Sequence, residues 1–175
     1  MQAFKPLYLT LGIIGCGEVL ANEIPSAYLI VSQAYHVPAD ILYAVALTES
    51  GKDYQGKHLP WPWTLNIAGL GVYCATQDEA KAMLLRKISE QPSIDIGLMQ
   101  INWRWHQHRF KSFDDALLPM RNLAVGAMIL GEQFNDTQDW WQAVGRYHAP
   151  GQDAQSRRNA ERYRQRVHKH WQALF

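Results

Sequence analysis

Glu49 is the side chain of this sequence best suited to general acid chemistry. It stands in the last turn of a predicted helix, and the residues before it, Ala44 to Leu47, are all apolar. Burial in apolar surroundings disfavours the charged form of a carboxyl group and therefore raises its pKa. A carboxyl group that stays protonated near pH 7 can donate its proton to the leaving oxygen of a glycosidic bond. Glu49 is therefore the candidate acid.

A second block of polar side chains runs from Asp95 to Asn102 and contains the sequence Gly-Leu-Met-Gln. Gly97 permits another group to approach the backbone closely. Gln100 and Asn102 carry amides that can hydrogen-bond a hydroxyl or an amide of a ligand. Met99 counts among the candidate contacts because it lies in this block, although its apolar side chain also suits a core position.

A third block, Arg146-Tyr147-His148, brings a phenol to the end of a predicted helix. Together the three blocks resemble the lytic transglycosylases of the soluble, goose-lysozyme-like family. In that family a Glu-Ser pair ends a helix and is followed by Gly-Leu-Met-Gln and then by Ala-Tyr-Asn. Glu49-Ser50 matches the first element, and the resemblance covers residues 24–148. Two features, the stretch Trp61–Asn66 and the pair Tyr147-His148, more closely resemble the small transglycosylases that accompany secretion and conjugation machines.

The resemblance implies a role for each matched residue. Glu49 would be the acid and base, Ser50 would hydrogen-bond near the scissile sugar, and Gln100 would hold the substrate. Tyr147 would orient Glu49 through its hydroxyl. The remaining candidate substrate contacts are Met99, Asn102 and His148. The implied substrate is the peptidoglycan glycan strand, whose own C6 hydroxyl attacks to leave a 1,6-anhydro end. No metal or cofactor is expected.

Two departures from the family pattern keep alternatives open. His148 stands where the family has Asn, and Pro150 follows where small residues are common. Asp95 could instead activate water, which would make the protein a hydrolytic lysozyme with its two carboxyl groups ~6.5 to 9.5 Å apart. We expect Asp95 rather to cap a helix that begins near Gly97. A third alternative is a non-catalytic peptidoglycan-binding component of a secretion assembly.

Hydrophobic periodicity and capping residues predict the elements that position these blocks. The expected helices cover residues 25–35, 38–51, 76–89, 114–118, 119–134, 139–147 and 153–174. β-Branched and aromatic residues around Ala68-Gly69 predict a short hairpin over residues 64–75. The expected fold is α+β and mainly helical, a lysozyme-like single domain with a short β-hairpin.

The N-terminal residues 1–21 have the order of features of a secretory signal. Lys5 precedes an apolar run, and Val19-Leu20-Ala21 resembles a cleavage site, so residues 22–175 would form the transglycosylase domain. A periplasmic location follows. Ile13 to Cys16 also resembles a lipoprotein processing box, which would leave Cys16 acylated, and a buried N-terminal helix is the remaining alternative.

The net charge of +1 conceals a basic C-terminal segment. Residues 153–175 carry six basic and two acidic side chains, a net charge of +4. Apolar residues recur through the same segment at helical spacing, at Ala160, Tyr163, Val167, Trp171 and Leu174. The segment is therefore expected to be a docked helix with a solvated basic face, and no nucleic-acid partner is expected. The expected partners are glycan strands and components of a secretion or conjugation apparatus.

Overall fold

The computed structural model describes residues 23–90 and 93–175. The predicted signal segment, including Cys16, lies outside the described residues. The α-helices are α1 (Ser26–Tyr35), α2 (Ala39–Ser50), α3 (Gln77–Lys87), α4 (Trp103–His106), α5 (Phe113–Leu117), α6 (Pro119–Thr137), α7 (Trp140–His148) and α8 (Ala154–Gln172). The strands are β1 (Gly51–Tyr54), β2 (Lys57–Pro60), β3 (Thr64–Ile67), β4 (Leu70–Tyr73), β5 (Ile94–Ile96) and β6 (Ile101–Asn102). Two short 3-10 helices are η1 (Ile88–Glu90) and η2 (Gln107–Arg109).

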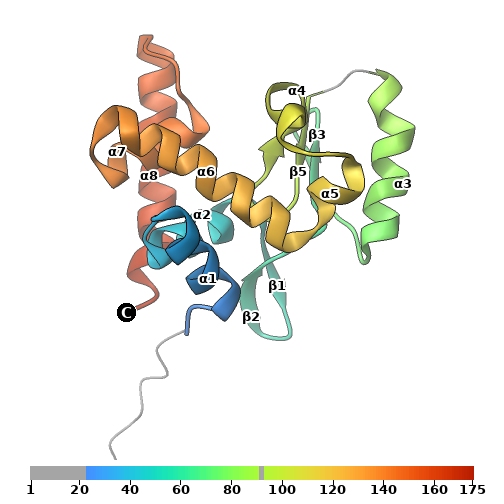
Figure 1. The fold of residues 1–175 in the computed structure, drawn as a ribbon, viewed down its shortest axis with the longest axis horizontal. Helices are drawn as coiled ribbons and strands as arrows, with labels where there is room; N and C mark the ends of the chain where they lie inside the picture. Colours follow the sequence, from blue (N-terminus) through green and yellow to red (C-terminus); the bar gives the residue numbers. More distant parts are fainter. Residues whose placement is uncertain (1–22, 91–92) are drawn as a thin grey trace, which may run out of the picture.

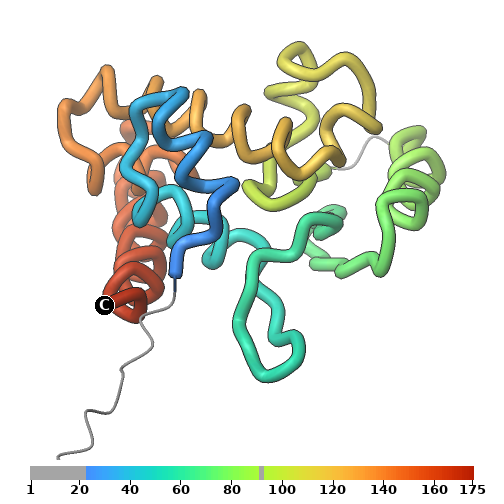
Figure 2. The backbone as a smooth tube through the Cα atoms, turned by 60° about the horizontal axis from the view of Figure 1, so that its bottom comes forward, coloured from blue at the N-terminus to red at the C-terminus, as the bar shows by residue number. Residues whose placement is uncertain are grey.

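The molecule has two halves that α6 joins. In Figure 1, α7 and α8 lie at one end of α6, while the sheet and α3 lie toward its other end. The turned view in Figure 2 keeps the same division, with α1 and α2 on the side of α8. The expected architecture, a mainly helical α+β domain of the lysozyme-like kind, is confirmed. No helix in the described part of the chain is both long and apolar enough to cross a bilayer.

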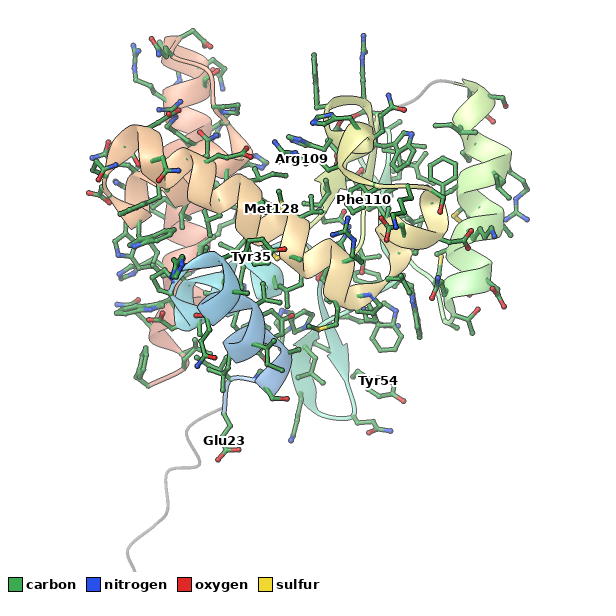
Figure 3. All side chains as sticks on the ribbon, in the orientation of Figure 1. Glu23, Tyr35, Tyr54, Arg109, Phe110 and Met128 are labelled. Atoms are coloured by element: carbon green, nitrogen blue, oxygen red, sulfur yellow. The ribbon has the colours of Figure 1, made fainter. Side chains whose placement is uncertain are left out.

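Each half has its own apolar cluster. The larger cluster contains the buried residues of α1, α2, α6, α7 and α8, and the smaller one lies between the four-stranded sheet, α3 and α5. Phe110, labelled in Figure 3, packs against both clusters. Arg109, its neighbour, forms a two-pronged ion pair with Glu132 of α6, with N–O distances of 2.8 and 2.9 Å. These contacts fasten the sheet half to the helical half.

The sheet is richer than the sequence predicted. The hairpin expected over residues 64–75 is confirmed as β3 and β4, and Ala68 and Gly69 both adopt positive φ in its turn. This hairpin belongs to an antiparallel sheet of order β4-β3-β5-β6. A second, separate hairpin, β1–β2, follows α2 directly, with Tyr54 near its tip (Figure 3). The sequence analysis predicts no strand in this segment, whose charged and polar residues lack the apolar alternation of a strand.

The C-terminal helix α8 docks as its apolar stripe predicted. Tyr163, Val167 and Leu174 are buried in the larger cluster, and the helix packs against α2 and α7. Asp153 caps its N-terminus by accepting hydrogen bonds from two backbone N–H groups. The docking places the middle of α8 against the end of α2, where Glu49 lies.

Candidate active site

Glu49 lies in the last turn of α2, one residue before the helix ends and two before β1 begins. Glu49 as a whole residue is half-buried, and most of the preceding turn is buried. Its pKa is raised to about 7, mainly by burial and to a smaller extent by the negative charge of Asp95. A hydrogen bond from Tyr163 and the positive charge of Arg166 act in the opposite direction. Glu49 therefore exchanges a proton near neutral pH, as the predicted acid requires.

Tyr163 of α8 holds this carboxyl group. Its hydroxyl donates to Glu49 Oε1 at 2.6 Å, and its side chain is almost completely buried. Burial keeps the pKa of the phenol well above its ordinary value, so the phenol remains a donor. We had read Tyr163 only as part of an apolar stripe. The signal available in the sequence was that a buried tyrosine needs a partner for its hydroxyl.

Tyr147 does not make the contact predicted for it. Its hydroxyl donates to the backbone oxygen of Met99 at 2.7 Å, and the bond to Glu49 comes from Tyr163 instead. Tyr147 is nonetheless a neighbour of the acid, because the charge of Glu49 adds to burial in raising its pKa. Tyr147 therefore stabilises the turn that contains Met99 through this hydrogen bond.

His148 lies at the edge of the same site. Its ring stacks on that of Tyr163, with centroids 4.6 Å apart and planes inclined by 4°. Burial and the charge of Arg166 lower the pKa of His148, so the ring is neutral at pH 7. His148 thus covers the face of the tyrosine that holds Glu49. A substrate contact by His148 stays a prediction.

The segment after β5 is a tight turn, and the helix expected near Gly97 is absent from it. Gly97 and Gln100 have φ values of +81° and +45°, and the N–H of Gln100 donates to the backbone oxygen of Gly97. Positive φ at a residue with a Cβ is strained, and such strain often marks a functional turn. The Gln100 side-chain amide donates to the backbone oxygens of Thr64 and Gly97. Its nitrogen therefore fixes the turn, and a substrate contact through Gln100 stays a prediction.

Asp95 is not a helix cap. It lies on β5 opposite Asn102 of β6, and its Oδ1 accepts a hydrogen bond of 2.7 Å from the Asn102 side chain. Asn102 Oδ1 is itself the cap of α4, accepting from the N–H of Trp105 at 3.4 Å. Burial raises the pKa of Asp95, and the bond from Asn102 partly offsets this. The cap was wrongly assigned because the sequence did not reveal the hairpin between β5 and β6.

Ser50 and Met99 are interior residues, and their side chains are fully buried. Ser50 Oγ lies 2.8 Å from the backbone oxygen of Leu98, so its hydroxyl ties the end of α2 to the turn. The Met99 side chain packs where Gly126 of α6 leaves room for it. The predicted substrate contacts by these two side chains are therefore corrected: both support the turn beside Glu49.

Asn122 of α6 stabilises the turn between β5 and β6 through hydrogen bonds to its backbone. It is buried, and its Oδ1 accepts from the N–H of Met99 at 2.9 Å. Its Nδ2 donates to the backbone oxygens of Ile96 and Ala116, at 2.8 and 3.1 Å. A Cβ at Gly97 would lie 2.5 Å from this amide, so only glycine fits there. No pattern in the sequence indicates Asn122, since a lone asparagine in an apolar helix is not distinctive.

Asn122→Ala should lower the free energy of unfolding by about 3 kcal/mol, because it removes three buried hydrogen bonds, each contributing ~0.5 to 1.5 kcal/mol net. Denaturant unfolding followed by circular dichroism measures the change. Asn135→Ala is the matched control, an exposed asparagine on the same helix, and should change stability by about 0.5 kcal/mol or less. Equal effects of the two substitutions would contradict the role of Asn122.

The parts of the chain described here hold no group of three or more His, Cys, Asp or Glu side chains placed to bind a metal ion. A comparison with family models matches residues 27–170 to the transglycosylase SLT domain. No curated protein and no solved structure gave a match.

Proposed function

Because this chain belongs to the transglycosylase SLT domain family, whose members are peptidoglycan lytic transglycosylases, we propose that it cuts glycan strands with Glu49 as acid and base. The bond cleaved is the β-1,4 link between N-acetylmuramic acid (MurNAc) and N-acetylglucosamine (GlcNAc). One observation carries the assignment of Glu49: a carboxyl group with a pKa of about 7 that accepts a hydrogen bond from a buried tyrosine. No other described carboxyl group accepts a hydrogen bond from a tyrosine hydroxyl.

In the first step Glu49 donates its proton to the glycosidic oxygen as the bond to C1 of MurNAc breaks. The leaving GlcNAc departs with a neutral 4-hydroxyl, and positive charge develops at C1. Glu49 is then a carboxylate, which the Tyr163 hydroxyl stabilises because a hydrogen bond to an ionised acceptor is about twice as strong as one to a neutral acceptor. Tyr163 therefore acts most strongly after the proton has left.

In the second step the carboxylate takes the proton of the MurNAc C6 hydroxyl as that oxygen bonds to C1, with assistance from the N-acetyl group. The product ends in a 1,6-anhydro ring, and Glu49 is again protonated. No water is consumed, so a single carboxyl group suffices. The two roles need a group whose pKa lies near the working pH, which is the property burial gives Glu49.

Digestion of purified peptidoglycan, followed by mass analysis, tests this product. Fragments with 1,6-anhydro ends are lighter by one water than hydrolytic fragments. Asp95→Asn should leave these ends unchanged and retain activity within about tenfold, since general-base loss costs ~10²-fold or more. The alkaline limb of the pH profile should move to lower pH, because the negative charge of Asp95 helps to raise the pKa of Glu49.

Hydrolysis is the second candidate, and the closeness of Asp95 favours it, since the charge of Asp95 reaches Glu49. If Asp95 activated water, Asp95→Asn should abolish lysis as completely as loss of Glu49. Wild-type fragments should then carry reducing ends. The hydrogen bond from Asn102 to Asp95 supports the structural role instead, because it engages one carboxylate oxygen within the sheet.

We further propose that the enzyme is exported and opens the wall locally for an envelope-spanning secretion or conjugation apparatus. Its substrate lies outside the cytoplasm, which is consistent with the signal predicted over residues 1–21. The similarity of Trp61–Asn66 to small transglycosylases of such machines supports the assignment. These residues begin β3 and form the segment leading into it, beside the turn held by Gln100.

A further inference from the structure

Arg166 differs from the other arginines of α8. Each of the other four donates to a neighbour on or just before the helix: Arg157 to Gln152, Arg158 to Gln155, Arg162 to Asn159 and Arg164 to Glu161. Arg166 is exposed, and no hydrogen bond or ion pair within residues 23–90 and 93–175 engages its guanidinium. It is therefore a cation available to a ligand.

The position of Arg166 ties it to the catalytic acid. It follows Tyr163 by three residues, so the two side chains are neighbours on the helix surface. Its guanidinium carbon lies 5.4 Å from the centre of the Tyr163 ring, and the hydroxyl of that ring is 2.6 Å from Glu49. The charge of Arg166 reaches both Glu49 and His148. The exposed cation thus lies beside the place where the scissile bond must bind.

The proposed substrate carries an anion within reach of this cation. MurNAc differs from GlcNAc by a lactyl group on O3, two carbons away from the C1 atom at which Glu49 acts. In a peptide-free strand the lactyl group ends in a carboxylate, and in a substituted strand it bears a peptide with carboxylates of its own. Arginine suits either anion, because its planar guanidinium binds a carboxylate through two parallel hydrogen bonds.

We propose that Arg166 is a specificity residue that binds a carboxylate carried on the lactyl substituent of the MurNAc at the cleavage site. The proposal rests on the function proposed above. It explains how a site with one catalytic carboxyl group selects a MurNAc residue over the otherwise similar GlcNAc. Positive charge beside Glu49 also favours approach of an anionic glycan.

Binding measurements in the Glu49→Gln background test the proposal without turnover and without any change in the ionisation of residue 49. The ligands are a GlcNAc–MurNAc tetrasaccharide bearing peptides, the same tetrasaccharide without peptides, and a GlcNAc tetrasaccharide, which has no carboxylate. Adding Arg166→Gln should weaken binding of a MurNAc ligand about fivefold, the scale of one partly exposed ion pair. Binding of the GlcNAc tetrasaccharide should stay unchanged, which also shows that the variant is folded.

Arg162→Gln is the matched control, because Arg162 is also exposed and lies one turn earlier on α8. It should not alter the preference for MurNAc ligands. Arg166→Lys should restore part of the affinity, since it keeps the charge and loses the paired hydrogen bonds. The difference in affinity for MurNAc ligands between the proteins with and without Arg166 should decrease as the salt concentration rises, because salt screens exposed charges. Loss for the peptide-bearing ligand alone would identify a peptide carboxylate as the bound anion, and loss for the peptide-free ligand alone would identify the lactyl carboxylate. Loss for both would show that Arg166 accepts either carboxylate.

Two results would overturn the proposal: equal weakening of all three ligands, or no weakening of the MurNAc ligands by Arg166→Gln. Failure of the proposed transglycosylase function would give a different result. In that case the wild-type protein would release no glycan fragments from purified peptidoglycan, whatever residue stands at position 166.

Discussion

Replacement of Glu49 by Gln should reduce the release of glycan fragments from purified peptidoglycan by ~10²-fold or more, the usual contribution of general acid catalysis. The amide has nearly the shape of the protonated carboxyl group and can still accept the hydrogen bond from Tyr163. It cannot donate a proton to the leaving oxygen or take one from the C6 hydroxyl. Fragment release is followed by mass analysis, and the fold by circular dichroism.

Asp53→Asn is the control for Glu49→Gln. Asp53 lies four residues further on, in β1, and its side chain is 90% exposed. Its loss should leave lysis unchanged. Activity of Glu49→Gln within about tenfold of wild type would remove Glu49 from the mechanism. The same variant distinguishes an enzyme from a non-catalytic binding component. In cells that lack the wild-type protein, Glu49→Gln should restore function fully if the protein has only a structural role, and should fail to restore it if the protein acts as an enzyme.

Tyr163→Phe should lower activity about tenfold at the optimum and move the alkaline limb of the pH profile upward by about 1 pH unit. A hydrogen bond to a charged group contributes ~1.5 to 3 kcal/mol, and one pKa unit corresponds to ~1.4 kcal/mol. Since Tyr163 lowers the pKa of Glu49 by stabilising its carboxylate, loss of the hydroxyl must raise that pKa. Glu49 then stays protonated, and so active as an acid, to higher pH.

The dependence of kcat/KM on pH measures this shift, because it reports the pKa of the free enzyme. Tyr147→Phe is the matched control: its hydroxyl binds the backbone of Met99, so its loss should leave the position of the limb unchanged. A shift in Tyr147→Phe with none in Tyr163→Phe would restore the role that the sequence assigned to Tyr147. A purely structural role for Tyr163 would lower activity without moving the limb.

The helices could be predicted from the sequence because their signals are local. Thr76 followed by Glu79 predicted the start of α3, and the structure shows Thr76 Oγ accepting from the N–H of Glu79 at 3.2 Å. The docked face of α8 followed from the spacing of Tyr163 and Val167. An apolar helix end alone is a weak signal for an acid, and Glu49 could be selected because the three blocks together match the family pattern. Its raised pKa agrees with that selection.

The supporting contacts could not be predicted, because each depends on partners far apart in sequence. The turn after β5 was read as a helix start, since a glycine followed by apolar residues suits either structure. Its identity depends on Asn122 and on the pairing of β5 with β6. Tyr147 and Tyr163 are both tyrosines on helices near the acid. Only the docking of α8 decides which hydroxyl reaches Glu49.

Glu49 and the hydroxyl that holds it are separated by 114 residues. A ribosome delivers the N-terminal part of a chain first, so α2 is complete long before α8 emerges. Until α8 docks, the carboxyl group lacks both its tyrosine and the burial that this helix provides, and burial is the main cause of its raised pKa. With Glu49 in the role proposed above, lytic competence therefore arises only with the docking of α8.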